Sequence, residues 1–215
     1  YPLIFFAVNL IGIAAALMLE SGFGCDPIGL LCDGISRALN IKYGTGCFIY
    51  NITVIAGSLA VSRKELGAGT VLYGLASGFF IDFYQAVFSR FGLAERGAGM
   101  AVTAFIIGEL CMSLAFALLM QLNLGMTALD AVLMKLEKIT HTRYLFLKTA
   151  SDILMITAGI LLGGVFGPGT IFSALVTGTL TSQLGKLIGN VQGKRVKGEA
   201  KRVKCEKVQW NFYRE

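Results

Sequence analysis

Long apolar runs dominate the chain, and two short segments that mix apolar and polar residues interrupt them. A helix rises 1.5 Å per residue, so runs of about 20 residues are long enough to cross a hydrocarbon core of about 30 Å. The pattern therefore predicts an all-α polytopic membrane protein. The predicted spans are residues 1–19, 44–61, 67–91, 99–122, 144–162 and 167–188.

The two short segments, residues 26–40 and 127–140, have the pattern of amphipathic helices. Asp26-Pro27 is a favourable helix start, because proline at the first helical position gives up an N–H that would have no partner and the aspartate caps the others. The second segment opens on a Thr-Ala-Leu-Asp capping box that ends at Asp130. We interpret both aspartates as helix caps.

A glycine-threonine stretch occurs twice, as Gly-Ala-Gly-Thr at residues 67–70 and as Gly-Pro-Gly-Thr at residues 167–170. Positions around it match at an offset of 100 or 101, so that Asn51 corresponds to Asp152. So long a period in an apolar chain is typical of two-repeat transporters rather than of solenoids. Each half then reads as span, short helix, span, span. The expected units are repeat 1 in residues 1–97, repeat 2 in residues 98–190 and a basic tail in residues 191–215.

Whether the short helices cross the membrane decides how the two halves are related. Three crossings per half would invert the second half relative to the first, and four would leave the halves parallel. If the short helices cross and the tail is cytoplasmic, most loop arginines and lysines fall on the cytoplasmic side, as the positive-inside rule requires, and Arg63 and Lys64 are the exceptions. We therefore expect eight helices in parallel repeats, with re-entrant short helices and inverted repeats as the alternative.

Composition agrees with a membrane protein and argues against nucleic-acid binding. Apolar residues make up 55% of the chain and charged residues 15%, a balance typical of chains that live in a bilayer. The formal net charge is +6, but acidic and basic residues balance in residues 1–185, so the excess lies in the tail. The chain opens at Tyr1 directly on an apolar run, and we expect the native chain to begin upstream.

Few residues suit catalysis or metal binding. The chain has one histidine, and its five cysteines lack the paired spacing of a zinc site. We interpret the cysteines as small buried residues. Because no Ser/His/Asp order and no phosphate-binding loop is present either, we expect no enzymatic activity, no cofactor and no metal site.

Several short motifs carry a family resemblance: Gly-Phe-Gly-Cys-Asp-Pro at residues 22–27, Asn51 in the next span, and Leu-Gly-Ala-Gly-Thr leading to Gly-Phe-Phe-Ile-Asp, which ends at Asp82. In these motifs the chain resembles the YczE/YitT-like family of small bacterial inner-membrane proteins. The resemblance implies a duplicated multi-pass protein of the bacterial cytoplasmic membrane, of a kind often described as a transporter of unknown substrate. Ser182 replaces Asp82 in the second half.

Polar residues near the middle of the predicted spans are the candidates for function, because a charge at the centre of a bilayer costs at least about 2.5 kcal/mol. Asn51, Glu109 and Asp152 lie near the midpoints of their spans, Lys148 is one turn from Asp152, and Asp82 is slightly past a midpoint. We expect these five residues to form a substrate or ion site between the halves. The alternatives are structural: Lys148–Asp152 as a buried pair, Asn51 as a bond between helices, and Asp82 as a solvated or structural group.

The sequence therefore favours a secondary transporter or permease for a small solute, with the lipid bilayer as its surroundings. Acidic residues outnumber basic ones among the candidates, which favours a cationic or proton-coupled substrate. Asp33 and Arg37, four residues apart on the first short helix, are expected to form a solvated pair. The alternative function is a non-transporting membrane protein that acts on a partner through its basic tail, which ends in Trp210, Phe212 and Tyr213.

Overall fold

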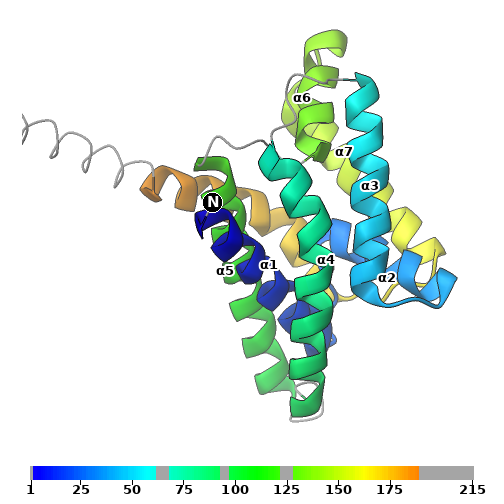
Figure 1. Cartoon of the computed structure of the whole chain (residues 1–215), viewed down its shortest axis with the longest axis vertical. Coiled ribbons are helices and arrows are strands. Elements are labelled where there is room, and N and C mark those ends of the chain that lie inside the picture. The colour runs from blue at the N-terminus through cyan, green and yellow to red at the C-terminus, as the bar shows by residue number, and fades with distance from the viewer. Residues whose placement is uncertain (1, 62–67, 93–96, 122–127, 189–215) are drawn as a thin grey trace, which may run out of the picture.

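The computed structural model describes residues 2–61, 68–92, 97–121 and 128–188, and these residues are helical with short connections (Figure 1). The tail that the alternative function requires lies outside them. The prediction of an all-helical protein is confirmed for the described residues. The helices are α1 (Pro2–Ser21), α2 (Pro27–Leu39), α3 (Tyr43–Val61), α4 (Ala68–Phe88), the 3-10 helix η1 (Ser89–Phe91), α5 (Ala98–Gln121), α6 (Ala128–Thr140), α7 (Tyr144–Leu161) and a last helix over residues 168–188.

The short helix α2 begins and ends close to its predicted bounds, but the side chain of Asp26 makes no capping hydrogen bond. Pro27 occupies the first helical position after Asp26. At the other end Asn40 adopts a left-handed conformation with φ 52°, and the amide of Ile41 donates to the carbonyl of Ser36. This is a C-terminal cap in which a left-handed residue turns the chain back and satisfies the last carbonyls. The cap fixes α2 at 13 residues.

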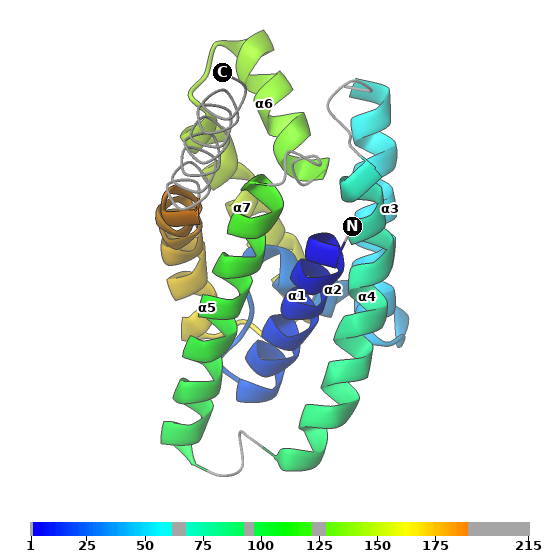
Figure 2. The ribbon, with the colours of Figure 1, turned by 60° about the vertical axis from the view of Figure 1, so that its left-hand side comes forward.

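Helix α1 lies between α4 and α5 (Figure 2). Glycines make these contacts close: a side chain at Gly12 would collide with Phe80, and one at Gly108 would collide with Met18. Small residues at such contacts let helix backbones approach one another without a gap. The apolar core is built around α1 and reaches α2, α3 and α5.

A second group of contacts surrounds the short helices. Helix α2 packs against α7 and α3, and α6 packs against α3 and α7. Gly34 of α2 faces the backbone of Gly159 in α7, where an added Cβ would lie 2.6 Å from the carbonyl oxygen of Gly159. The first and second halves of the chain are therefore joined by α1 against α5, α2 against α7, and α6 against α3.

The helix directions contradict parallel halves. Phe23, just past the end of α1, packs against Phe105, while Met18 lies against the later residue Gly108, so α1 and α5 run in opposite directions. Parallel halves would make these two corresponding helices point the same way. The expectation of parallel repeats was therefore wrong, and the inverted alternative fits the helix directions.

The short helix α2 does not cross the molecule. Phe5 and Asn9 of α1 contact Phe80 and Tyr84 in the same order, so α1 and α4 are parallel, whereas α3 is antiparallel to α4. Helices α1 and α3 therefore run in opposite directions, and the chain between them returns to the side it left. Thirteen residues span only about 20 Å, too little for a bilayer core. The positive-inside rule had favoured crossing short helices over re-entrant ones, and for α2 this choice was wrong.

Polar and apolar residues are distributed as in a membrane protein. Large apolar side chains are exposed on the outer faces of several helices, among them Phe79, Leu154, Leu161 and Leu175, each at least 70% exposed. Serines, threonines and Glu109 are among the buried residues. Within the described residues, two helical stretches, Leu3–Ser21 and Ala98–Leu119, are long and apolar enough to cross a membrane. Two of the six predicted spans thus meet this criterion.

Candidate functional site

Glu109 is the most deeply buried of the predicted site residues. It lies on α5, its side chain is 2% exposed, and both of its carboxyl oxygens contact hydroxyls of the last helix. Oε2 lies 2.5 Å from Ser173 Oγ and Oε1 lies 2.5 Å from Thr177 Oγ1. Sequence spacing along α5 gave no hint of these partners, because they come from a helix more than sixty residues away.

Lys148 and Asp152 form the ion pair within α7 that their spacing predicts. Lys148 Nζ is 3.0 Å from Asp152 Oδ1, and the two side chains are 31% and 14% exposed. Nearby, the hydroxyl of Tyr50 contacts the sulfur of Met155, which brings α3 against α7 next to Asn51 and Asp152. Asn51 and Asp152, which correspond in the two halves, thus lie on helices that touch at Tyr50 and Met155.

Asn51 ties α3 to α4. Its Nδ2 donates to the carbonyl oxygen of Gly74 at 3.2 Å and to Ser77 Oγ at 3.3 Å. Asn51 thus forms the hydrogen bond between helices that the sequence analysis gave as its structural alternative to a binding role. Asn51 and Ser77 also line the internal cavity described below, so the structural role and exposure to a small ligand coexist.

Asp82 occupies a different place. Its Oδ1 accepts a hydrogen bond of 2.7 Å from the backbone amide of Gly44, in the first turn of α3. A carboxylate at that position satisfies an amide that has no partner within its own helix, and it also interacts favourably with the helix dipole. The contact explains Asp82 as a cap supplied by a neighbouring helix, and Asp82 is not among the residues that line the cavity.

The sequence interpretation of Asp26 missed what surrounds it. The start of α2 lies inside the molecule, and the carboxyl of Asp26 is close enough to interact electrostatically with Glu109, Lys148 and Asp152. Three of the five predicted site residues thus interact electrostatically with a residue that the sequence identified only as a helix cap. The sequence did contain one signal: Asp26 precedes a helix that is too short to cross a bilayer. This signal points to a buried Asp26 only if the short helix is taken as re-entrant. The side chain of Asp130, the other expected cap, lies outside the described residues.

A partly open cavity of about 40 Å³ lies beside Asp26. This volume has room for two or three water molecules, at about 10–15 Å³ each. Its walls come from α1 to α5 and combine polar groups with apolar and aromatic side chains. Its polar lining residues include Asp26, Tyr43, Tyr50, Asn51 and Ser77.

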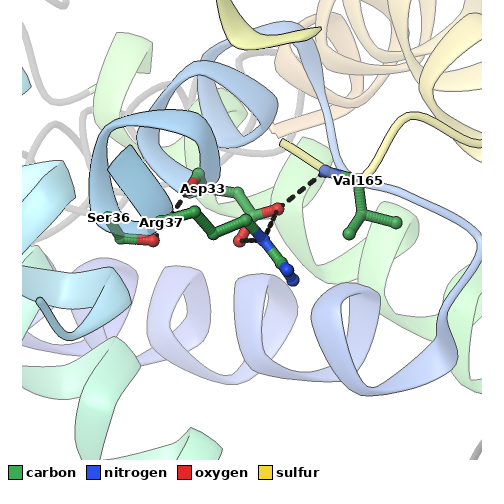
Figure 3. A network of polar contacts seen from close by, with 4 residues as sticks. All are labelled: Asp33, Ser36, Arg37 and Val165. Atoms are coloured by element: carbon green, nitrogen blue, oxygen red, sulfur yellow. Dashed lines mark hydrogen bonds and ion pairs between the residues drawn. The ribbon is translucent and has the colours of Figure 1, made fainter. Parts of the chain in front are cut away.

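The structure corrects the expectation for Asp33 and Arg37. They do form an ion pair, with Arg37 Nε 2.9 Å from Asp33 Oδ2, but only Arg37 is solvated: its side chain is 54% exposed and that of Asp33 is 8% exposed. Asp33 Oδ2 also accepts a hydrogen bond of 2.8 Å from the backbone amide of Val165, in the loop before the last helix (Figure 3). The carboxylate therefore fastens α2 to the loop that follows α7.

The cysteines behave as small buried side chains, as predicted. Cys25, Cys32 and Cys47 are buried near the start of α2, Cys111 is half-buried, and these four are free thiols. Cys205 lies outside the described residues. Among the described residues no group of histidine, cysteine, aspartate and glutamate has the arrangement needed to hold a metal ion.

The arrangement as a whole provides charges and hydrogen bonds. It places the carboxyl group of Asp26 at a cavity of water-sized dimensions, and two further carboxyl groups and one ammonium group are close enough to interact with it. Groups of this kind can hold a small cation or a proton, because a buried charge is tolerated when an opposite charge or hydrogen bonds compensate it.

The family model that matches the chain, over residues 1–186, is described as a family of unknown function (DUF6198). An "Uncharacterized protein" of Haemophilus influenzae is 26% identical over 179 residues, which cover 83% of this chain and 79% of that protein. "Uncharacterized protein YyaS" of Bacillus subtilis is 21% identical over 177 residues, which cover 80% and 86%. No solved structure matches. The match supports an uncharacterised family with bacterial members and carries no YczE or YitT designation.

Proposed function

The chain belongs to the DUF6198 family, whose function is unknown, and from its geometry we propose that it is a secondary transporter for a small cationic solute. We place it in the bacterial cytoplasmic membrane as a multi-pass protein with its basic tail on the cytoplasmic side. The observation that carries the proposal is Asp26: it lies half-buried just before α2, it lines a cavity, and it is close enough to Glu109, Lys148 and Asp152 to interact with them electrostatically.

Membrane insertion is supported by the inverted distribution of polarity. A water-soluble protein rarely exposes apolar patches of more than a few hundred Å², whereas here leucines and phenylalanines are exposed on helix after helix. Buried groups such as Glu109, Ser113 and Ser173 occupy the interior instead. In hydrocarbon this distribution is favourable, since polar groups are satisfied inside and apolar groups face lipid.

The position of α2 supports a transport site. In many secondary transporters, helices that stop halfway through the membrane direct their ends at a site near the midplane. The positive end of the α2 dipole stabilises the carboxylate of Asp26 at such a position. Irregular backbone, such as residues 22–26 before α2, is tolerated at membrane depth only where protein or a water-filled cavity surrounds it.

The directions of the helices support an exchange between two states. We propose that the two halves are inverted copies, because α1 opposes α5 and because α2 packs on α7 as α6 packs on α3. Inverted halves that pack on each other can interchange their conformations, which opens a central site to each side of the membrane in turn.

The charges around the cavity favour a cation. Three carboxyl groups, those of Asp26, Glu109 and Asp152, lie with one ammonium group, that of Lys148. A carboxylate beside the aromatic rings of Tyr43 and Tyr50 suits a small ammonium ion, which gains from both the opposite charge and the ring faces. The volume of about 40 Å³ in this conformation suits a solute of a few heavy atoms.

Binding to the purified full chain tests the proposal. Thermal unfolding would be followed with small ammonium ions, amino acids and organic anions of similar size. We expect at least one cation to raise the unfolding temperature, because a ligand that binds only the folded state stabilises it. The Asp26→Asn variant should lose this shift, and the matched Asp82→Asn variant, which alters a carboxylate outside the cavity, should keep it.

A second matched pair controls for hydrogen bonds between helices. Asn51→Ala removes a bond from α3 to α4 at the cavity, and Asn9→Ala removes the bond from Tyr84 to α1 away from it. Only Asn51→Ala should reduce the increase in unfolding temperature that the cation causes. If no cation stabilises the protein, or if the Asp82 and Asn9 variants lose the shift as fully as the cavity variants, the transporter proposal fails. Loss of cellular function only on removal of residues 191–215 would favour a role through the tail.

A further inference from the structure

If the carboxyl group of Glu109 is ionised, the hydroxyls of Ser173 and Thr177 do not carry enough hydrogens to supply one to each close oxygen–oxygen contact around it. Thr177 Oγ1 lies 2.5 Å from Glu109 Oε1 and also 2.7 Å from the carbonyl oxygen of Ser173. A threonine hydroxyl has one hydrogen and two lone pairs. The Thr177 hydroxyl can therefore donate to only one of these two oxygens. If it donates to the carbonyl oxygen of Ser173, the hydrogen in its contact with Glu109 must come from the carboxyl group of Glu109.

We propose that Glu109 carries this hydrogen, as a protonated carboxyl group that donates to Thr177, and that it is the proton-coupling residue of the transporter. The hydroxyl of Thr177 then donates to the carbonyl of Ser173, and the hydroxyl of Ser173 donates to Glu109 Oε2. Each oxygen contact has one hydrogen in this arrangement. The coupling role rests on the proposed transport function, whereas the proton itself does not.

The seam between α5 and the last helix is suited to proton uptake. Hydroxyls recur on one face of the last helix at Thr170, Ser173, Thr177 and Thr181; Thr177 is half-buried, and the other three are each at most 8% exposed. On α5, Ser113 follows Glu109 by one turn and is fully buried. Because helical side chains point toward the N-terminus, the hydroxyl of Ser113 is directed back toward the level of Glu109.

Some of these hydroxyls have unused hydrogen-bonding capacity. The side-chain oxygens of Ser113, Thr170 and Thr181 are buried and have no hydrogen-bond partner among the described residues. Buried hydroxyls are normally satisfied by protein or water, so these three, on the two helices that Glu109 joins, can still form further hydrogen bonds. Hydroxyl groups both donate and accept, which is the property a proton path requires.

The charged groups that face Glu109 link the proton to the solute. Asp26, just before α2, is close enough to interact electrostatically with Glu109 and with Lys148 and Asp152 of α7. The other packed helices add little: α1 carries only Glu20, at its end, and the last helix carries only Lys186, far beyond Thr177. When Glu109 is protonated, Asp26 loses a neighbouring negative charge; when the proton leaves, the negative charge next to the cavity increases by one.

Proton and cationic solute would therefore compete for the same negative charge. A cation in the cavity is favoured by ionised Glu109, and uptake of one proton by Glu109 favours its release. In a carrier with alternating access this competition gives exchange of one proton for one unit of solute charge across the membrane. The chemistry is proton transfer alone, from water on one side through Glu109 to water on the other.

Infrared spectroscopy of the purified full chain tests the protonation state directly. We expect the C=O stretching band of a protonated carboxylic acid at neutral pH, its loss in Glu109→Gln, and its persistence in Asp26→Asn and Asp152→Asn. Thr177→Val should shift the band, because the carboxyl group loses its acceptor. The Thr177 variant also keeps the test open if Glu109→Gln does not fold. Absence of the band in the wild type, its persistence in Glu109→Gln, or an unshifted band in Thr177→Val would overturn the proposal.

Sodium is the competing explanation, since carboxyl and hydroxyl oxygens also bind this ion. Thermal unfolding in sodium chloride and in choline chloride of equal concentration separates the two. We expect Glu109→Gln to change the unfolding temperature by the same amount in both salts. A stabilisation specific to sodium that is lost in Glu109→Gln would overturn the proton assignment. The infrared band does not depend on a solute, so a band that behaves as expected in a protein that no cation stabilises would leave Glu109 protonated and refute transport alone.

Discussion

Asp33 offers the sharpest test of how the re-entrant helix α2 is held in place. Its carboxylate makes two contacts of different kinds: an ion pair with Arg37 on its own helix, and a hydrogen bond with the backbone amide of Val165 before the last helix. Three substitutions separate them. Asp33→Ala removes both contacts, Asp33→Asn keeps an acceptor for Val165, and Arg37→Ala removes the ion pair alone.

The two contacts should differ several-fold in strength. The arginine is 54% exposed, so the ion pair resembles a surface pair at positions i and i+4, which contributes about 0.3–0.5 kcal/mol. The bond to Val165 is made by a buried carboxylate to a backbone amide, and hydrogen bonds to charged groups contribute about 1.5–3 kcal/mol. Asp33→Ala should therefore cost about 2–3 kcal/mol, and each of the other two variants about 1 kcal/mol or less.

Thermal unfolding of the three purified variants measures the difference. For a chain of this size, 1 kcal/mol corresponds to about 2–4 °C, so Asp33→Ala should lower the unfolding temperature by about 4–12 °C and Asp33→Asn by a few degrees at most. If Arg37→Ala destabilises as much as Asp33→Ala, the ion pair holds α2 and the role given to Val165 is wrong. High salt provides a second check, because it should weaken only the exposed ion pair.

Two further predictions concern packing and topology. Gly34→Ala should destabilise the protein by more than about 1 kcal/mol, since the new Cβ would lie 2.6 Å from the carbonyl oxygen of Gly159. The control Gly57→Ala should be neutral or slightly stabilising, because a Cβ there meets nothing within 4 Å. Equal unfolding temperatures for the two variants would contradict the contact between α2 and α7. Single cysteines introduced at Asn40 and Thr140, at the ends of α2 and α6, should react with a membrane-impermeant reagent from opposite sides of the membrane in intact cells, because α2 lies beside the beginning of α3 and α6 beside its end (Figures 1 and 2). Labelling of both from one side would restore the parallel arrangement.

The helices themselves could be predicted from the sequence because their signals are local. Runs of apolar residues define the long helices, and Asp26-Pro27 with Asn40 defines α2 to within a residue or two. The pair Lys148–Asp152 was equally accessible, since residues four apart on a helix are neighbours by geometry. Each of these features depends on residues that are close in the chain.

The position of α2 and the partners of Glu109 could not be predicted, because both depend on helices distant in sequence. The positive-inside rule favoured a crossing α2, because that arrangement puts most loop arginines and lysines on the cytoplasmic side, and it says nothing about which helices surround Asp26. Ser173 and Thr177 resemble the other small polar residues of apolar helices until α5 is placed beside them. Asp33 shows the same limit: its local partner Arg37 was predicted, and its distant partner Val165 was not.

The corresponding positions of the proposed duplication make different contacts. Asn51 and Asp152 correspond at an offset of 101, and Ser77 and Thr177 correspond at an offset of 100. In the first half Asn51 is bonded to Ser77, so this pair ties α3 to α4 through a neutral hydrogen bond.

In the second half Thr177 contacts Glu109, and Asp152 is paired with Lys148 on its own helix. Asn51 is thus neutral where its counterpart Asp152 is ionisable. Two inverted halves need matching packing to exchange conformations, but a single carboxyl group suffices to carry a proton.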